Sequence, residues 1–262
     1  MYITVQYPST CNLPVPCPYC YSRPSVIAEI GTPEQWAEWL LALPGTGHHF
    51  SFAFGEPTQE RCVPLYRAVL DAGHAVTLTT NLYADPACLG NLRMSLCLSW
   101  HPHAIDLPTF AGRRLQCEAQ GQHVGDTLAV AYPPYLQHIA RWREEYRDFT
   151  GDPLKVLAYC GLHDGKRYPE AYTDAERAVV YGDSNPRYDE PVNWCVESPR
   201  GHRCRVGMEY MLIAQDGTAR ACPNDPQTVI GDVRTGITIP TEPVVCRNDR
   251  CGCVDLWRYI EP

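Results

Sequence analysis

The chain has 262 residues, of which 45 % are hydrophobic, so it can bury the core of one large domain or of a domain with a small appendage. Its net charge of -8 excludes a global basic field of the kind that gathers nucleic acid. No apolar run approaches the roughly 20 residues that a membrane span needs, and the start MYITVQYPST lacks the basic head and apolar core of a signal peptide, which predicts a cytoplasmic protein.

Short apolar runs alternate with helical patterns up to about residue 180. Most of these runs are continuous rather than alternating, as is typical of strands that are buried on both faces. The order strand, helix, strand repeats about six times and predicts a parallel sheet with right-handed crossovers, either an open doubly wound sheet or a partial barrel. We expect strands at 2–7, 49–54, 75–81, 92–100, 127–132 and 154–160, and helices at 32–43, 57–73, 107–121 and 131–149.

Two of these helices carry recognisable end signals. Thr32 is a suitable N-cap ahead of Pro33, because its hydroxyl can accept a hydrogen bond from a free backbone N–H of the first turn. Gly73 is a typical C-terminal cap, since glycine takes up the left-handed conformation there without strain.

The alternation of apolar runs and helical patterns ends near residue 182. The segment that follows is loop-like, and residues 209–223 then predict a β-hairpin with its turn at Asp216-Gly217. The remaining tail is rich in Pro, Gly and Cys. We therefore predict two domains, 1–182 and 183–262, of which the second is a small cysteine-rich β-hairpin domain.

The chain has 14 cysteines, which is many for a cytoplasmic protein. In a reducing compartment such a number favours metal binding or catalysis over disulfides. Five of them stand singly in apolar or helical surroundings and are interpreted as small buried side chains: Cys62, Cys88, Cys97, Cys117 and Cys160. The others form two groups near the two ends of the chain: Cys11, Cys17 and Cys20, and Cys195, Cys204, Cys222, Cys246, Cys251 and Cys253.

The first group, Cys11, Cys17 and Cys20, follows the first predicted strand directly. In a barrel or an open parallel sheet, the loop after a strand lies at the carboxyl edge, where ligands bind. A structural zinc site needs four ligands, so a zinc knuckle here would take its fourth ligand from elsewhere. The other possibility is a 4Fe-4S cluster with one iron left open for a small molecule.

Motifs at the ends of the next strands accompany this loop, and the combination resembles the radical S-adenosylmethionine (radical SAM) superfamily. Each motif falls at the carboxyl end of a predicted strand, where the superfamily's pattern has it. The usual cysteine spacing is Cys-x3-Cys-x2-Cys, whereas this chain has a longer first interval, Cys11-x5-Cys17. The matching residues are Cys11, Cys17, Tyr19 and Cys20, then Gly55-Glu56-Pro57, Thr80-Asn81 and Ser99.

The resemblance implies a partial (β/α)6 TIM-like barrel over about residues 1–180. It implies that the three cysteines hold a 4Fe-4S cluster whose open iron takes the amino and carboxylate groups of S-adenosylmethionine (SAM). Gly55-Glu56-Pro57 would meet the methionine ammonium, which a carboxylate or a turned backbone carbonyl satisfies. Tyr19 would lie against the adenine. Thr80, Asn81 and Ser99 would complete the cofactor site through polar groups.

The second cysteine group resembles the twitch domain, a half-SPASM domain that holds an auxiliary 4Fe-4S cluster in radical SAM enzymes. A hairpin that carries Cys204 and Cys222 and precedes a cysteine-rich tail fits that pattern. The expected ligands are Cys204, Cys222 and two or more of Cys246, Cys251 and Cys253. A four-cysteine zinc ribbon is the alternative, although its usual pair of CxxC knuckles is absent.

The resemblance implies an enzyme that reductively cleaves SAM to a 5′-deoxyadenosyl radical, which takes a hydrogen atom from a small-molecule or peptide substrate. A flavodoxin- or ferredoxin-type protein would supply the electron. The auxiliary cluster would accept an electron, bind substrate or relay charge; the sequence leaves these three roles open. Candidate catalytic residues at strand ends are His101, His163 and Asp164; for each, a solvated loop residue is the favoured alternative.

Two other functions remain open at this point. A binding module held together by zinc would use the same two cysteine groups without catalysis. A radical SAM enzyme that modifies RNA would also match the motifs, but the acidic charge and the lack of a basic stripe interleaved with aromatic residues oppose nucleic-acid binding.

Overall fold

A computed structural model describes residues 1–7, 9–20, 29–182, 198–249, 251 and 258–261. The chain divides into two compact units, and each is assembled from segments that are far apart in sequence. Unit 1 comprises Met1–Thr10, Pro24–Leu78 and Glu190–Pro262, and unit 2 comprises Cys11–Arg23 and Thr79–Asp189. These units differ from the predicted division into 1–182 and 183–262, which stays a prediction about domain organisation.

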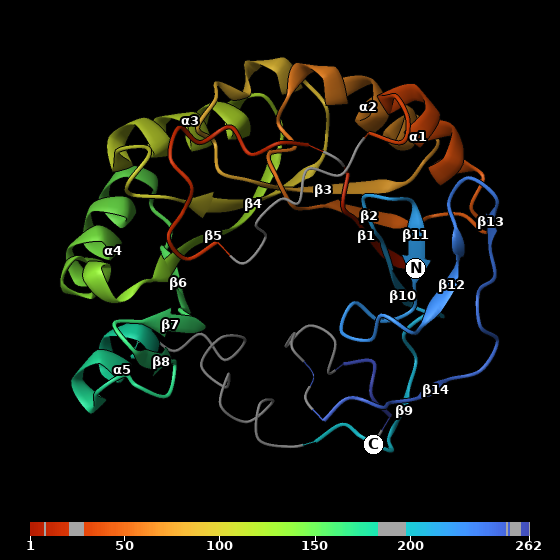
Figure 1. Cartoon of the computed structure of the whole chain (residues 1–262). Helices are drawn as coiled ribbons and strands as arrows, with labels where there is room; N and C mark the ends of the chain where they lie inside the picture. The colour runs from red at the N-terminus through yellow and green to blue at the C-terminus, as the bar shows by residue number, and fades with distance from the viewer. Residues whose placement is uncertain (8, 21–28, 183–197, 250, 252–257, 262) are drawn as a thin grey trace. The chain divides into compact units, whose positions relative to one another are not determined.

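Unit 1 contains a mixed sheet in the order β13-β12-β11-β10-β1-β2-β3 (Figure 1). Strands β1, β2 and β3 are parallel, and β10 adds to β1 in parallel, so that Val5 pairs with both Phe52 and Ile213. From β10 onward the strands are antiparallel, which confirms the hairpin turn predicted at Asp216-Gly217. The strands are β1 (Tyr2–Val5), β2 (His49–Phe52), β3 (Ala75–Thr80), β10 (Tyr210–Ile213), β11 (Thr218–Arg220), β12 (Val229–Asp232) and β13 (Gly236–Ile237).

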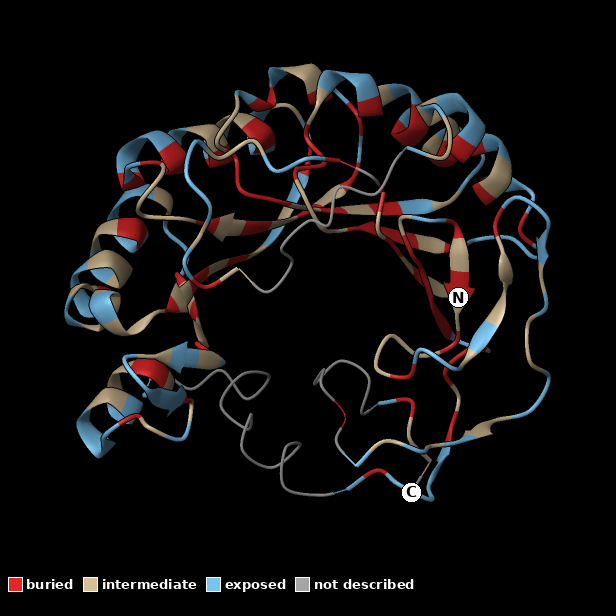
Figure 2. Cartoon of the chain, viewed as in Figure 1, coloured by how far each residue is buried: buried red, intermediate tan, exposed pale blue. Residues whose placement is uncertain are grey.

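Helices α1 (Pro33–Leu41) and α2 (Val63–Asp71) follow β1 and β2 and cover one face of their sheet (Figure 1). The predicted cap is present: Thr32 Oγ1 accepts from Gln35 N–H at 3.3 Å, and Gln35 Oε1 accepts from Thr32 N–H at 2.9 Å. Trp36 on α1 and Leu65 on α2 are fully buried, as Figure 2 shows for the inner sides of both helices. A short 3-10 turn, η1 (Glu60–Cys62), precedes α2, so the helix starts later than predicted.

Strand β9 (Arg203–Cys204) pairs antiparallel with β14 (Val244–Val245) at the end of unit 1. The pairing aligns Cys204 with Val244 and therefore brings Cys246 close to the same place, although the two cysteines are far apart in sequence. The backbone N–H of Cys246 donates to His202 O at 2.9 Å, which extends the pairing by one step.

Unit 2 is built on three parallel strands, β4 (Ser95–Trp100), β5 (His123–Ala131) and β6 (Lys155–Ala158). Helix α3 (Leu107–Ala119) connects β4 to β5, and α4 (Leu136–Thr150) connects β5 to β6 (Figure 1). The predicted helix 131–149 starts later, because β5 continues to Ala131 and Pro133–Tyr135 form the 3-10 turn η3. Another 3-10 turn, η2 (Pro86–Leu89), follows β3.

The polar segment after β6, for which we predicted neither helix nor strand, is folded. It forms the hairpin β7 (Gly161–His163) and β8 (Lys166–Tyr168), followed by helix α5 (Asp174–Tyr181). The sequence carries local signals for both. Asp164 and Gly165 have φ values of 47° and 73°, as a tight turn requires, and Thr173 forms a capping box with Glu176.

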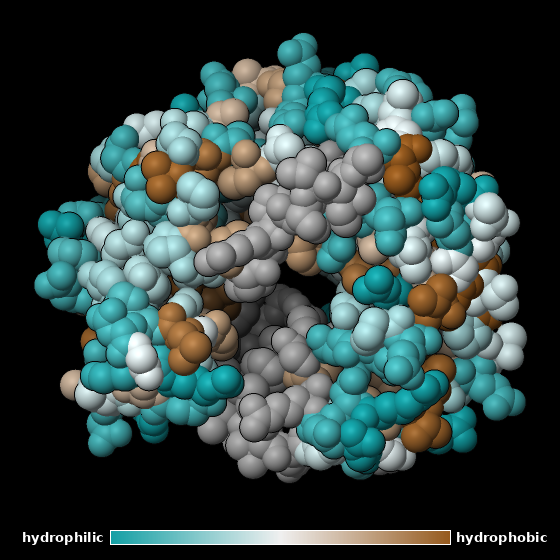
Figure 3. Space-filling view, viewed as in Figure 1, coloured by the Kyte–Doolittle hydropathy of each residue, from teal (hydrophilic) through white to brown (hydrophobic). Residues whose placement is uncertain are grey.

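Several large apolar side chains of the described residues are exposed to solvent. On the face drawn in Figure 3, hydrophobic residues form separate patches among hydrophilic ones. Exposed examples are Val15, Leu162 and Val245. None of the helices in the described ranges combines the length and apolar character that crossing a membrane requires.

Candidate functional site

The cysteine loop of unit 2 brings its three thiols within electrostatic reach of one another. Burial, followed by the charges of Cys20 and Cys11, raises the pKa of Cys17 to about 12. The backbone N–H of Cys20 donates to Cys17 O at 3.1 Å and fixes the turn between them. A thiol that resists ionisation in this way becomes a thiolate readily when it binds a metal, because the positive charge offsets the cost of burying an anion.

His101 lies against this loop at the carboxyl end of β4. Its Nδ1 atom is 3.3 Å from Cys17 Sγ and 3.0 Å from Tyr19 Oη. Burial lowers the pKa of His101 to about 4, so that the ring is neutral at physiological pH. The structure thus places a residue predicted to act on substrate in contact with a predicted cluster ligand.

Tyr19, predicted to lie against adenine, is 6 % exposed and belongs to an aromatic cluster. Its ring stacks on His101 at a centroid distance of 5.8 Å and lies 5.6 Å from the Tyr132 ring. Burial holds the pKa of its hydroxyl well above the usual value, and the hydroxyl hydrogen-bonds the Cys17 thiol. Tyr132 and Tyr135 were not among the predicted site residues; their signal was the aromatic pair YPPY directly after the fifth strand.

The Gly55-Glu56-Pro57 motif forms a rigid turn in unit 1. Gly55 has φ +63°, and a Cβ atom there would lie 1.9 Å from Ser9 O, so only glycine fits. Glu56 is fully buried, and its Oε1 accepts from Thr58 N–H at 2.8 Å and from Thr58 Oγ1 at 2.5 Å. The Tyr66 hydroxyl donates to Pro57 O at 2.8 Å. The Glu56 carboxylate therefore stabilises the turn through its two hydrogen bonds to Thr58.

Changing Gly55 to alanine tests this close approach. We expect Gly55→Ala to destabilise the fold by about 3 kcal/mol, because the new methyl group strains the backbone and clashes with the Ser9 carbonyl. Gly73→Ala is the matched control: it also has positive φ, at +83°, but nothing lies within 4 Å of the added atom. Gly73→Ala should cost only about 1 kcal/mol. Urea unfolding of the cluster-free proteins measures both, and equal midpoints would contradict the packing argument.

Thr80 ends β3 and Asn81 follows it; both belong to unit 2 and are buried. Asn81 Nδ2 donates to Asn12 Oδ1 at 2.9 Å, and Asn81 Oδ1 accepts from Tyr83 N–H at 2.7 Å. Because Asn12 lies between Cys11 and Cys17, Asn81 holds the cysteine loop from the next strand end. Ser99 is half-buried within β4.

His163 and Asp164 lie at the tip of the β7–β8 hairpin. His163 Nδ1 is 3.1 Å from Tyr132 Oη, so this residue joins the aromatic cluster that also contains Tyr19. The Asp164 carboxylate is 3.4 Å from His163 Nε2, but its side chain is 86 % exposed. The structure therefore brings His101 and His163 to the same cluster and leaves Asp164 in solvent.

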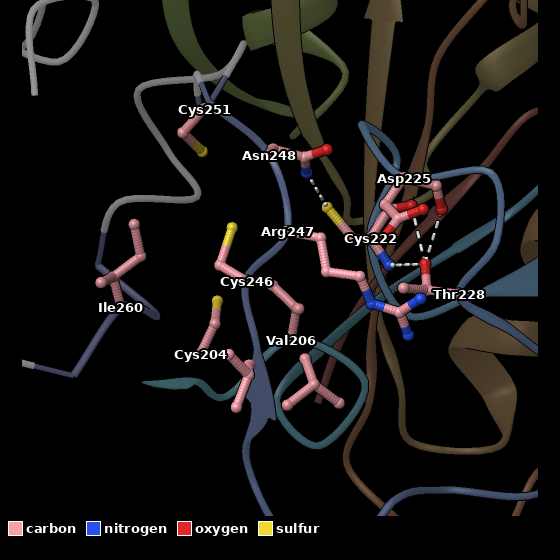
Figure 4. A pocket seen from close by; sticks show the side chains of 12 residues that line it. Cys204, Val206, Cys222, Asp225, Thr228, Cys246, Arg247, Asn248, Cys251 and Ile260 are labelled. Carbon is pink, nitrogen blue, oxygen red and sulfur yellow. Dashed lines mark hydrogen bonds between the residues drawn. The ribbon is translucent and has the colours of Figure 1, made fainter. Parts of the chain in front are cut away.

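Four cysteines of the second group line one pocket in unit 1. Cys222 lies across this pocket from Cys204, Cys246 and Cys251 (Figure 4). Thr228 holds the Cys222 turn: its Oγ1 accepts from Cys222 N–H at 3.1 Å and donates to Asp225 O at 2.7 Å. Cys253 and Cys195 lie outside the described residues.

The pocket offers four thiols, the donor type that iron–sulfur clusters take. Burial raises the pKa values of Cys204 and Cys222, whereas backbone N–H groups of Val206, Asn224 and Asp225 donate to their sulfurs and favour the thiolate. Within the described ranges, no three Cys, His, Asp or Glu side chains are close enough to bind one metal ion. A cubane cluster takes one thiolate on each of its irons, so its ligands stand further apart.

Comparison with known proteins finds relatives by structure alone. No family model and no curated protein matches the sequence. The structure of anSMEcpe with bound AdoMet and Cp18Cys peptide superposes with a TM-score of 0.60 at 15 % identity over 90 % of this chain and 78 % of that one. Streptococcus suis SuiB bound to S-adenosylmethionine gives 0.58 at 17 % identity over 100 % of this chain and 66 % of that one.

The chain shares the fold of these two proteins, whose structures contain bound SAM. A third structure, anSMEcpe with bound AdoMet and Kp18Cys peptide, agrees at a TM-score of 0.61 and 13 % identity. The resemblance inferred from the cysteine loop and the strand-end motifs is thereby confirmed at the level of the fold. The mixed α/β architecture with its large parallel sheet is the part of the predicted fold class that these structures share.

Proposed function

We propose that the protein is a radical SAM enzyme that cleaves SAM reductively and uses the 5′-deoxyadenosyl radical to take a hydrogen atom from a peptide. The observation that carries this proposal is the loop of Cys11, Cys17 and Cys20, which Asn81 holds at the end of β3 through its hydrogen bond to Asn12. It occurs on a fold shared with two proteins whose structures contain SAM. We assign β1 to β6 and their helices to a partial (β/α)6 barrel, and 183–262 to a twitch/SPASM-like domain.

Cys11, Cys17 and Cys20 would hold a 4Fe-4S cluster, which supplies the electron that splits the sulfonium bond when SAM is bound. Three thiolates leave one iron for the cofactor. Asn81 keeps the loop in place through Asn12. The Gly55-Glu56-Pro57 turn, whose shape is fixed by the close approach of Gly55 to Ser9, would bind the methionine ammonium.

The four cysteines that line the unit 1 pocket would hold the auxiliary 4Fe-4S cluster: Cys204, Cys222, Cys246 and Cys251. Four thiolates leave no iron open. Of the three roles that the sequence left undecided, this ligand set favours electron acceptance or relay over direct substrate binding. A flavodoxin- or ferredoxin-type donor would reduce the enzyme.

A peptide substrate is favoured over a small molecule because two superposing structures contain bound peptides. The candidate substrate-side residue that best fits this role is His163, whose ring faces Tyr132 at the edge of the aromatic cluster. Asp164 extends into solvent beside it and could meet a basic group of the peptide.

Anaerobic purification and reconstitution test the proposal. The protein should be brown, should contain about eight irons per chain as two 4Fe-4S clusters, and should form 5′-deoxyadenosine when SAM and dithionite are added. Colourless protein that contains zinc would instead establish the zinc-stabilised binding module. Incubation with peptide mixtures, followed by mass spectrometry for a loss of two hydrogens, then tests the substrate class.

A further inference from the structure

The Cys17 sulfur has two side-chain hydrogen-bond partners from different parts of unit 2. His101 Nδ1 lies 3.3 Å away, and the Tyr19 hydroxyl hydrogen-bonds the same thiol. Sulfur–nitrogen contacts of this length are hydrogen bonds when a proton lies between the atoms. The contact is therefore a property of the folded unit, because 84 sequence positions separate His101 from Cys17.

The position of His101 is fixed from several sides. Its carbonyl oxygen accepts from Ala104 N–H at 2.9 Å and from Ile105 N–H at 3.2 Å, which closes a turn directly after β4. The preceding Trp100 is buried and donates from Nε1 to Ile105 O at 2.9 Å. The imidazole itself is stacked on the Tyr19 ring. A ring held in this way keeps Nδ1 directed at the Cys17 sulfur and at the Tyr19 hydroxyl oxygen, 3.0 Å away.

The proton in this contact must belong to the imidazole once Cys17 binds iron. An iron-bound sulfur carries no proton and can only accept. Nδ1 must therefore carry hydrogen, which assigns the Nδ1–H tautomer to His101. The same Nδ1–H also faces the Tyr19 hydroxyl oxygen at 3.0 Å, which can accept from it while the hydroxyl donates its own proton to the sulfur.

We propose that His101 donates its Nδ1–H to the Cys17 thiolate and thereby raises the reduction potential of the N-terminal cluster. This inference rests on the proposed function. The electron added on reduction, from dithionite or a flavodoxin-type donor, increases the negative charge on the cluster and its sulfurs. A donor to sulfur stabilises that added charge, and hydrogen bonds to sulfur are a recognised determinant of cluster potentials. His101 is thus a positioning residue that acts through Cys17, and these contacts favour that role over one as an acid or base toward substrate.

Two substitutions separate the effect of the hydrogen bond that His101 donates from the effect of its packing. His101→Leu removes the donor, and His101→Asn retains an amide N–H near the place of Nδ1. In a redox titration followed by EPR, the signal that responds to SAM identifies the cluster with the open iron. We expect His101→Leu to shift its reduction equilibrium about tenfold toward the oxidised form, which is about 59 mV for one electron. His101→Asn should restore most of the shift. A leucine variant with the wild-type potential would overturn the inference, as would equal shifts in both variants.

A measurement on the unmodified protein keeps the inference testable if the leucine variant does not assemble its cluster. In enzyme grown with ¹⁵N-labelled histidine, pulsed EPR of the reduced, SAM-sensitive cluster should detect one weakly coupled ¹⁵N nucleus. The coupling should persist in His103→Asn, the matched control, because His103 Nε2 faces Val15 O at 3.4 Å and not the thiol. A normal cluster without ¹⁵N coupling in the wild type would overturn the inference alone. Failure of the wild type to bind iron would overturn the proposed function.

Discussion

Replacing Cys17 with alanine should remove SAM cleavage and about four of the eight irons expected per chain. Formation of 5′-deoxyadenosine should fall by more than about 100-fold, which is the upper limit for changes that only affect residues behind a metal ligand. The reason is that Cys17 is the most constrained thiol of its loop: it is electrostatically linked to both other cysteines and hydrogen-bonded to Tyr19 and His101. Iron analysis and chromatography of the reaction products give both values.

Cys88→Ala is the control for this experiment. Cys88 lies in the same unit, is partly buried and belongs to the 3-10 turn η2, outside the loop of Cys11, Cys17 and Cys20. This variant should keep the iron content and the cleavage rate of the wild type. If Cys17→Ala still cleaved SAM at the normal rate, the N-terminal loop would not be the cluster site, and the proposed function would fail.

Replacing Cys222 with alanine should remove the other cluster and leave SAM cleavage intact. We expect the loss of about four irons from the unit 1 pocket, while SAM cleavage continues at the N-terminal cluster. Product formation from the peptide should fall by more than about 100-fold, because the electron released from the substrate radical would have no acceptor. A cluster that binds only the folded chain also stabilises it, so the thermal midpoint should fall. Iron analysis, mass spectrometry and calorimetry measure the three effects.

Asp225→Asn is the matched control for Cys222→Ala. Asp225 lines the same pocket, and its Oδ1 accepts from Gln227 N–H at 3.0 Å, a bond that asparagine can keep. The variant should therefore retain about eight irons. Full iron content in Cys222→Ala would show that other cysteines hold the auxiliary cluster. Loss of both clusters together would show that Cys222 acts through folding and not as a ligand.

Local signals predicted the parts of the fold that depend on neighbouring residues. The start of α1 was predicted from Thr32 and Pro33, because a cap needs only a side-chain oxygen one turn away from a free N–H. The β10–β11 hairpin was predicted from Asp216-Gly217 for a similar reason. Helix α5 carried an equally local signal at Thr173 and Glu176, and was missed because the polar composition of the segment favoured a loop.

Contacts between distant segments could not be predicted in this way. The parallel pairing of β10 with β1 joins Ile213 to Val5, and neither strand contains a pattern that specifies its partner. Strand pairing depends on register and on which faces become buried, and these are properties of the assembled sheet. For the same reason, the position of His101 at a strand end was predictable, but the atom that its ring contacts was not.

The chemistry of the protein could be inferred from the sequence by itself: two groups of thiols, and turn residues at strand ends where ligands bind. Residue type and chain spacing are sufficient for that inference, because metal preference follows from the donor atoms. Only the tertiary structure decided which side chains surround each thiol. It placed His101 on Cys17 and gathered Cys204, Cys222, Cys246 and Cys251 around one pocket. Such contacts depend on the packing of segments that are distant in sequence, and this packing produces no periodic pattern in the sequence.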